Sequence, residues 1–156
     1  MDIETWMKLL GKSQDDNAVK VALAAAGINK IPRLKKGYFD VTVELKGHGL
    51  SLVMHDEAFL KKLDDQDIGE GPLILTGVGA FLDKSANRDF YKGTLPYGIT
   101  ADMTQAVLRQ TLGPPTRSKD APAAFDLWFR DGVEAVARYT KEWKLRTFVL
   151  KLPGAI

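Results

Sequence analysis

Hydrophobic positions in the first 27 residues follow the spacing of two short amphipathic helices. The first stripe recurs every three or four residues and consists of Ile3, Trp6, Met7 and Leu10. The second stripe follows an acidic cap at Asp15 or Asp16 and consists of Val19, Ala22, Leu23 and Ala26. Because an α-helix has about 3.6 residues per turn, each stripe lies on one side of its helix. The pattern predicts a helical hairpin that ends at Gly27.

From residue 38 the spacing changes to strict alternation, which is typical of strands with one buried face. Residues 38–46 and 50–55 alternate in this way, and Gly47-His48-Gly49 between them is a hairpin signal. Residues 73–82 are nearly all apolar and predict a buried strand, with which residues 89–92 could pair. The first half of the chain therefore predicts helices followed by antiparallel strands.

The second half repeats this order. Thr104 is a helix cap, and Gly113 followed by two prolines ends the helix. Alternation then predicts strands at residues 125–129, 133–139 and 145–150. Phe39 and Phe125 each follow a helix-ending glycine by 12 residues, which suggests a loose internal repeat.

We predict an α+β fold on this basis. A single domain, 1–156, would consist of two related halves, 1–92 and 93–156, that share one continuous antiparallel sheet with the helices on one face. A chain of 156 residues with 45% hydrophobic content is long enough to bury such a core.

Composition narrows the function classes. The chain has no cysteine, which excludes disulfides, thiolate metal sites and cysteine nucleophiles. Its 22 basic and 20 acidic residues leave a net charge of +2, too balanced to indicate a nucleic-acid or membrane partner. Neither a secretory leader nor an apolar stretch of about 20 residues stands out. We expect a soluble cytoplasmic protein, and the sequence does not determine its oligomeric state.

Strand alternation also predicts which side chains would meet a partner. If Phe39, Val41 and Val43 face the helices together with Phe125, Leu127 and Phe129, their neighbours face the other way. Our candidate partner-binding residues are Trp128, Arg130, Asp126, Tyr38, Asp40 and Glu44, with Arg138 and Arg146 as weaker candidates. Trp128 and Arg130 are the expected anchors, because tryptophan and arginine dominate binding hot spots. The alternative is that segment 56–72 or a second copy of the chain covers Trp128.

A catalytic site is the alternative to this binding surface. His48 and His55, the only histidines, with Asp56 could form the centre of a small metal-dependent hydrolase. Their spacing matches no established metal signature, and Gly77-Val78-Gly79 lacks the third glycine of a dinucleotide loop. The acidic run 64–70 has the wrong spacing for an EF-hand and is interpreted as a solvated loop or a contact surface. We therefore expect no enzyme activity, metal or cofactor.

Two sets of motifs resemble known families. Met103-Thr104, Val107 and Leu112-Gly113-x-Pro115, followed by an antiparallel sheet, resemble the helix-to-sheet unit of β-lactamase-inhibitor proteins and small outer-membrane assembly lipoproteins. The wider layout is similar to that of bacterial toxin-immunity proteins, through Leu10-Gly11-Lys12-Ser13, Ala18-Val19, Gly49-Leu50-Ser51-Leu52, Gly93-x-Leu95-Pro96-Tyr97-Gly98-Ile99 and Leu112-Gly113-Pro114-Pro115.

The second resemblance implies an immunity protein that acts in competition between bacteria. Such a protein would bind a cognate toxin in the cytoplasm and neutralise it by stoichiometric protein–protein inhibition, without a cofactor. Two alternatives remain open, the small hydrolase and a scaffold module that binds a partner through the same sheet without inhibiting it. They differ in whether the histidines or the sheet surface carries the function.

Overall fold

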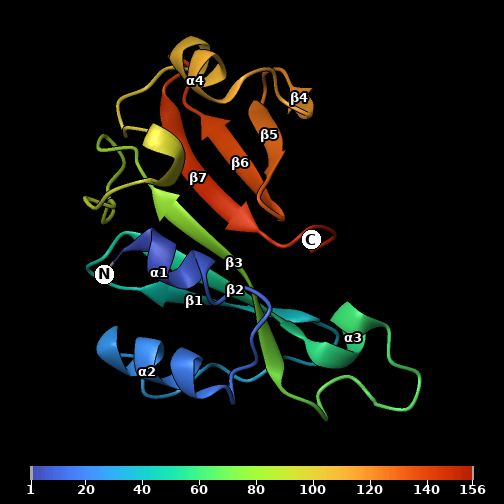
Figure 1. Ribbon diagram of the computed structural model, residues 1–156. Helices are drawn as coiled ribbons and strands as arrows, with labels where there is room; N and C mark the ends of the chain where they lie inside the picture. The colour runs from blue at the N-terminus through green and yellow to red at the C-terminus, as the bar shows by residue number, and fades with distance from the viewer. Residues whose placement is uncertain (1, 156) are drawn as a thin grey trace.

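The structure is a computed structural model that describes residues 2–155. Its fold is α+β, as predicted, with one antiparallel sheet in the strand order β1-β2-β3-β7-β6-β5-β4 (Figure 1). The helices are α1 (Ile3–Met7), α2 (Asn17–Ala25), α3 (Glu57–Lys61) and α4 (Gln105–Leu112), with a 3-10 turn, η1, at Pro96–Gly98. The strands are β1 (Asp40–Leu45), β2 (Leu50–Asp56), β3 (Leu73–Phe81), β4 (Arg117–Lys119), β5 (Phe125–Arg130), β6 (Val133–Tyr139) and β7 (Leu145–Lys151).

Two meanders, β1-β2-β3 and β4-β5-β6-β7, meet where β3 pairs with β7. Val78 lies opposite Leu150 in this pair, so strands more than 60 residues apart in sequence join the meanders into the continuous sheet that the sequence predicted. Residues 89–92 do not form the predicted extra strand, although the Tyr91 amide donates to the Phe81 carbonyl oxygen at 2.7 Å.

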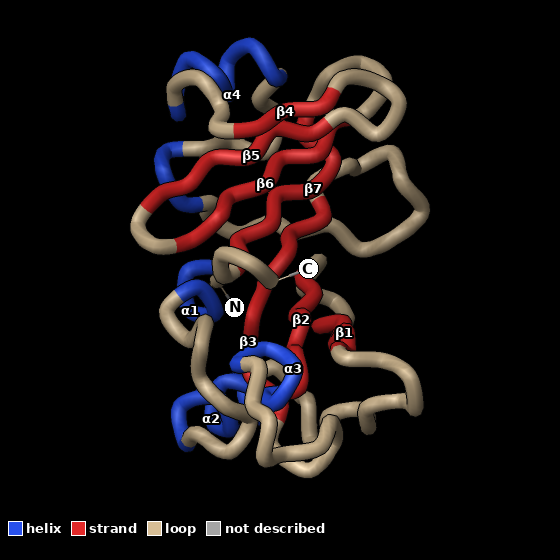
Figure 2. Tube along the Cα trace, turned by 90° about the vertical axis from the view of Figure 1, so that its right-hand side faces the viewer, coloured by secondary structure: helices blue, strands red, loops and turns tan. Residues whose placement is uncertain are grey.

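Helices α1, α2 and α4 lie against one face of the sheet (Figures 1 and 2). Their capping residues are among those the sequence indicated. Asp16 accepts a hydrogen bond from the Ala18 amide at 2.8 Å, and Thr104 accepts one from the Val107 amide at 3.4 Å. Fully buried side chains fill the space between helices and sheet, including Trp6, Leu108, Phe148 and Leu150. Within residues 2–155, the other face carries no helix over β4 to β7, and α3 lies at its β1–β2 end, where the Phe59 ring stacks on His55 with the ring centres 6.2 Å apart.

In β1, Val41 and Val43 are buried toward the helices as predicted, whereas Phe39, just before the strand, is 43% exposed and stacks on the Phe59 ring with the ring centres 4.2 Å apart. In β5 the prediction is wrong. Asp126 and Trp128 face the helices and are 0% and 3% exposed, whereas Phe129 is 57% exposed on the opposite face. Because the side-chain period of a strand is two, a shift of one residue exchanges the two faces.

The reason for the inversion is that α4 and β6 supply partners for polar groups on the inner face. Arg109 donates to both carboxylate oxygens of Asp126, at 2.9 and 2.7 Å, and the Tyr139 hydroxyl donates to the same carboxylate at 2.8 Å. The Trp128 indole N–H donates to the Gly113 carbonyl oxygen at 2.9 Å. The end of α4 therefore covers Trp128, rather than segment 56–72.

No helix within residues 2–155 is both long enough and apolar enough to cross a membrane.

Candidate functional site

The candidate site is the face of the sheet opposite the helices. Strand register places its side chains in rows that cross several strands. The central row consists of Arg117, Leu127, Val136, Val149 and Gly79. One flanking row consists of Lys119, Phe125, Arg138, Thr147 and Phe81, and the other of Phe129, Glu134, Lys151, Gly77 and Val53. Residues from both meanders thus meet on one continuous surface.

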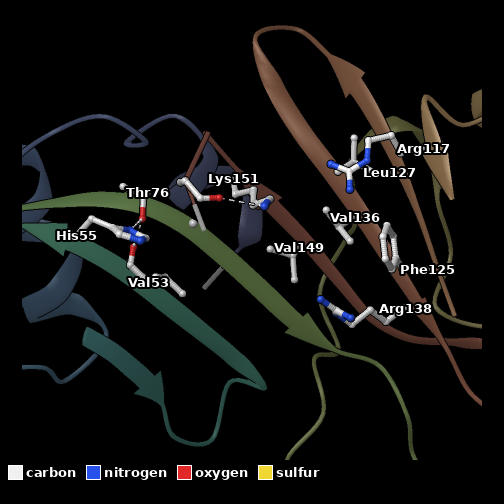
Figure 3. A pocket seen from close by; sticks show the side chains of 12 residues that line it. Val53, His55, Thr76, Arg117, Phe125, Leu127, Val136, Arg138, Val149 and Lys151 are labelled. Atoms are coloured by element: carbon white, nitrogen blue, oxygen red, sulfur yellow. Dashed lines mark hydrogen bonds between the residues drawn. The ribbon is translucent and has the colours of Figure 1, made fainter. Parts of the chain in front are cut away.

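A hollow of about 280 Å³ lies in this face, across the junction of the two meanders (Figure 3). Its floor is apolar and is formed mainly by Val53, Phe125, Leu127, Val136 and Val149. Gly77 also lines the hollow. Since glycine has no side chain, the surface of the sheet is hollowed at the point where β3 pairs with β7.

Three basic side chains surround this apolar floor, namely Arg117, Arg138 and Lys151. None of the described residues that line the hollow is an aspartate or glutamate. Arg138 lies 5.7 Å from the centre of the Phe125 ring, and the Lys151 ammonium donates to the Ala155 carbonyl oxygen at 3.0 Å. In the part of the chain that the structure describes, none of the three cations forms an ion pair with a carboxylate.

Glu134 is the acidic residue nearest to this arrangement in the strand register, opposite Lys151. One oxygen of its carboxylate accepts a hydrogen bond from the Gly154 amide at 3.3 Å, and Glu134 does not line the hollow. The lining groups therefore carry formal charges of +3, which favour an anionic group in the hollow.

His55 lies at the β2 end of the hollow and connects two strands. The Thr76 hydroxyl oxygen lies 2.6 Å from Nδ1 of His55, with which it forms a hydrogen bond, and 3.2 Å from the Val53 carbonyl oxygen. The Nε2 atom of His55 lies 3.8 Å from a carboxylate oxygen of Asp40. The buried imidazole thus ties β2 to β3 and to the start of β1.

The histidines and Asp56 do not converge on one centre. His48 lies in the β1–β2 turn and His55 near the far end of β2, seven residues away, which corresponds to roughly 20 Å along a strand. Asp56 caps α3, since its carboxylate accepts from the Phe59 amide at 3.1 Å and from the Gly69 amide at 2.8 Å. Within residues 2–155 no group of three histidine, aspartate or glutamate residues could hold a metal ion.

The predicted partner-binding residues are distributed over different parts of the molecule. Arg138 lines the hollow. Tyr38 and Glu44 are exposed at the β1 edge, where Glu44 lies 3.4 Å from Arg88. Asp40 is partly exposed beside His55.

The two expected anchors occupy other positions. Trp128 is buried under α4, as is its neighbour Asp126, so neither can contact a partner in this conformation. Arg130 is partly buried, with its guanidinium 4.9 Å from the centre of the Tyr97 ring. The predicted outward orientation of Trp128 followed from orienting β5 by hydrophobicity alone, and a partner-binding role of Arg130 stays a prediction.

Sequence reasoning missed Arg117, Lys151 and Gly77 as site residues. Arg117 lies in a three-residue edge strand, too short for alternation to be recognised. Gly77 was considered only as part of an incomplete dinucleotide loop, and its role in the hollow depends on Lys151, which lies opposite it across the β3–β7 pair. Glycines inside a strand are the signal that could have indicated an opening in the sheet surface.

Comparison with protein-family models, curated proteins and solved structures gives no match. The function is therefore inferred from the uncovered face itself.

Proposed function

We propose that this protein is an immunity protein, which binds a cognate bacterial toxin through the uncovered face of its sheet and neutralises it by forming a stoichiometric complex. The observation that carries the proposal is the apolar hollow with its three cations, in a sheet whose opposite face is already filled by helices. Arginine and aromatic side chains around an apolar centre are typical of protein-binding surfaces.

The extent of the face favours a protein partner. A stable interface buries about 1,200–2,000 Å² in total and needs roughly 20–30 residues from each side. The side-chain rows extend across the sheet beyond the hollow, and they present Phe129 at one border and Phe81 at another. Arg88 stacks on Phe81 with its guanidinium carbon 3.3 Å from the ring centre, which extends the aromatic and cationic surface further. These groups could surround the hollow with additional contacts.

Inhibition of this kind requires no catalytic group, metal or cofactor in the inhibitor. In this proposal, binding prevents the toxin from acting in the cytoplasm, where the immunity protein would already be present. Exposed basic side chains around the hollow would also accelerate encounter with an acidic surface on the toxin.

The test combines capture with a toxicity assay. The tagged protein is recovered from its native cells at moderate salt, and any protein bound in near-equal amount is identified by mass spectrometry. That protein is then expressed alone and together with the inhibitor. The proposal requires that the bound protein kills or arrests a host when expressed alone and that co-expression restores growth.

Matched variants locate the surface responsible. The double variant Arg117→Glu/Arg138→Glu should fail to restore growth, whereas Lys20→Glu, on the exposed side of α2, should restore it fully. A bound partner that is harmless when expressed alone would instead favour the scaffold alternative. Equal protection by the double variant and Lys20→Glu would exclude the hollow as the inhibitory surface.

A further inference from the structure

The positive charge of the hollow is not neutralised within the described chain. Arg117 and Arg138 come from β4 and β6, the strands that flank β5, and they lie on the same face as Leu127 and Phe125 of that strand. Figure 3 shows the two guanidinium groups on either side of the apolar floor. A guanidinium group binds a carboxylate through two parallel hydrogen bonds, so this arrangement favours a carboxylate over a neutral group.

The floor beside these cations selects for an apolar group. Leu127 and Val136 form its centre, and both are buried although no helix of the described chain covers this part of the face. A volume of about 280 Å³ is small for a complete drug-sized ligand, and it opens to the surface instead of being enclosed. It is therefore suited to one or two side chains that project from a larger surface.

From these two features we infer that the hollow receives an acidic side chain and a neighbouring apolar side chain from a loop of the partner protein. The carboxylate would bind a guanidinium group at the border of the floor, that of Arg117 or of Arg138, and the apolar side chain would rest on Leu127, Val136 and Val149. Lys151, at the β7 side of the hollow, adds a third positive charge that opposes a basic segment. This inference rests on the proposed function and specifies the chemistry of the toxin segment that is bound.

Blocked pentapeptides test this chemistry without the toxin. The probe is acetyl-Ala-Phe-Glu-Leu-Ala-amide, whose only charge is an internal glutamate, and its matched controls carry glutamine or lysine at that position. Binding to the full chain is measured from backbone amide chemical shifts in ¹⁵N NMR titrations. We expect shifts at Leu127, Val136 and Val149, about tenfold weaker binding of the glutamine peptide, and no binding of the lysine peptide.

Variants separate the contribution of charge from that of shape. In Arg117→Gln/Arg138→Gln the glutamate and glutamine peptides should bind equally, whereas Lys20→Gln should keep the preference for glutamate. A Cβ atom added at Gly77 would meet Lys151 Cβ at 3.5 Å and Val53 Cβ at 3.7 Å, which are ordinary contacts. Gly77→Ala should therefore fold and leave most binding intact, whereas the bulkier Gly77→Leu should narrow the hollow and weaken binding of all peptides. Thermal unfolding of each variant verifies its fold.

Three results would overturn the inference. These are equal binding of the glutamate and glutamine peptides to the unmodified chain, shifts that lie outside the hollow, or no binding of any peptide. Tighter binding of octanoate than of the glutamate peptide would also overturn it, because the hollow would then be a site for small amphiphilic acids. Failure here is distinct from failure of the proposed function, since growth protection that depends on Arg117 and Arg138 could still be observed without a preference for this peptide.

Discussion

Strands β1 and β5 begin alike and are oriented oppositely. The pair phenylalanine-aspartate stands at the start of both strands. In β1 the strand begins at the aspartate of Phe39-Asp40, and in β5 it begins at the phenylalanine of Phe125-Asp126. Hydrophobic and polar residues alternate in both. In β1 the aspartate lies on the uncovered side and is partly exposed, while in β5 it is completely buried under α4. The comparison teaches that alternation fixes which residues share a face and does not decide which face is buried.

The difference has an energetic cause. A buried carboxylate is tolerated only where charged and hydrogen-bonding partners compensate for lost water. Asp126 has Arg109 and Tyr139 as such partners, whereas the partner of Asp40 is His55 at 3.8 Å near the sheet edge. With Asp126 satisfied, the large indole of Trp128 can fill the core beside α4.

Truncation of Trp128 should give the largest contrast between the strands. Trp128→Ala removes a buried aromatic side chain and should lower the free energy of unfolding by about 3–5 kcal/mol. Thr42→Ala, at the matching position of β1, shortens an exposed side chain and should change the free energy of unfolding by less than about 0.5 kcal/mol. Urea unfolding followed by circular dichroism measures both. Similar small losses would show that Trp128 is not part of the core.

Removal of the buried carboxylate should have the next largest effect. Asp126→Ala leaves Tyr139 and Arg109 without their acceptor and should cost about 3 kcal/mol, less than complete isolation of a charge because Arg109 is partly exposed. Asp40→Ala in β1 should cost about 0.5 kcal/mol or less. The same unfolding experiment applies, and a loss below about 1 kcal/mol for Asp126→Ala would contradict the inward orientation of β5.

Alkaline pH should lower the free energy of unfolding through Tyr139, the hydrogen-bond partner of Asp126 on the inner face of β5. Burial, together with the hydrogen bond to Asp126, raises the pKa of Tyr139 well above the usual value of about 10. The unfolded chain therefore loses this proton first, so stability is complete below about pH 10 and falls as the pH rises, by up to about 1.4 kcal/mol per pH unit.

The variant Tyr139→Phe should reduce this slope of unfolding free energy against pH. Part of the slope should persist, because burial raises the pKa of Tyr91 to about 12 and that tyrosine also resists ionisation in the folded state. Urea unfolding at several pH values between about 8 and 11 provides the measurement. An unchanged slope in the variant would exclude Tyr139 as a source of the pH dependence.

The smallest difference in unfolding free energy between the two strands is expected at Phe129 of β5 and the matching Val43 of β1. Phe129→Ala removes a largely exposed ring and should change the free energy of unfolding by less than about 1 kcal/mol. Val43→Ala, the matching residue of β1, removes a buried side chain and should cost about 2 kcal/mol, although fewer atoms are deleted. Reversal of this order in thermal unfolding would indicate that Phe129 is covered in solution, for example by a second copy of the chain.

Much of the fold was predictable from local signals. Alternation located β1, β2, β5, β6 and β7, and the capping residues Asp16 and Thr104 located the starts of α2 and α4. These signals act over a few residues, because helix caps and strand periodicity are set by near neighbours in the chain. The relation between the two halves as repeats stays a prediction.

The site was less predictable, since it depends on contacts between distant residues. Of the predicted binding residues, Arg138 lies in the hollow, whereas Trp128, which was expected to face away from the helices, is buried. The opening at Gly77 exists because β3 pairs with β7, which places Lys151 opposite it. Because Gly77 and Lys151 are 74 positions apart in the chain, no local sequence pattern indicates that they pair.

By itself, the sequence determined the α+β class, the order of α1, α2 and α4 relative to the strands other than β4, and the exclusion of cysteine chemistry, because composition and periodicity suffice for these properties. Only the tertiary structure decided which face of β5 is buried and where the cationic hollow lies. A side chain is buried according to the partners it finds, and Arg109 for Asp126 and Gly113 for Trp128 are supplied by a helix that must first pack against the sheet.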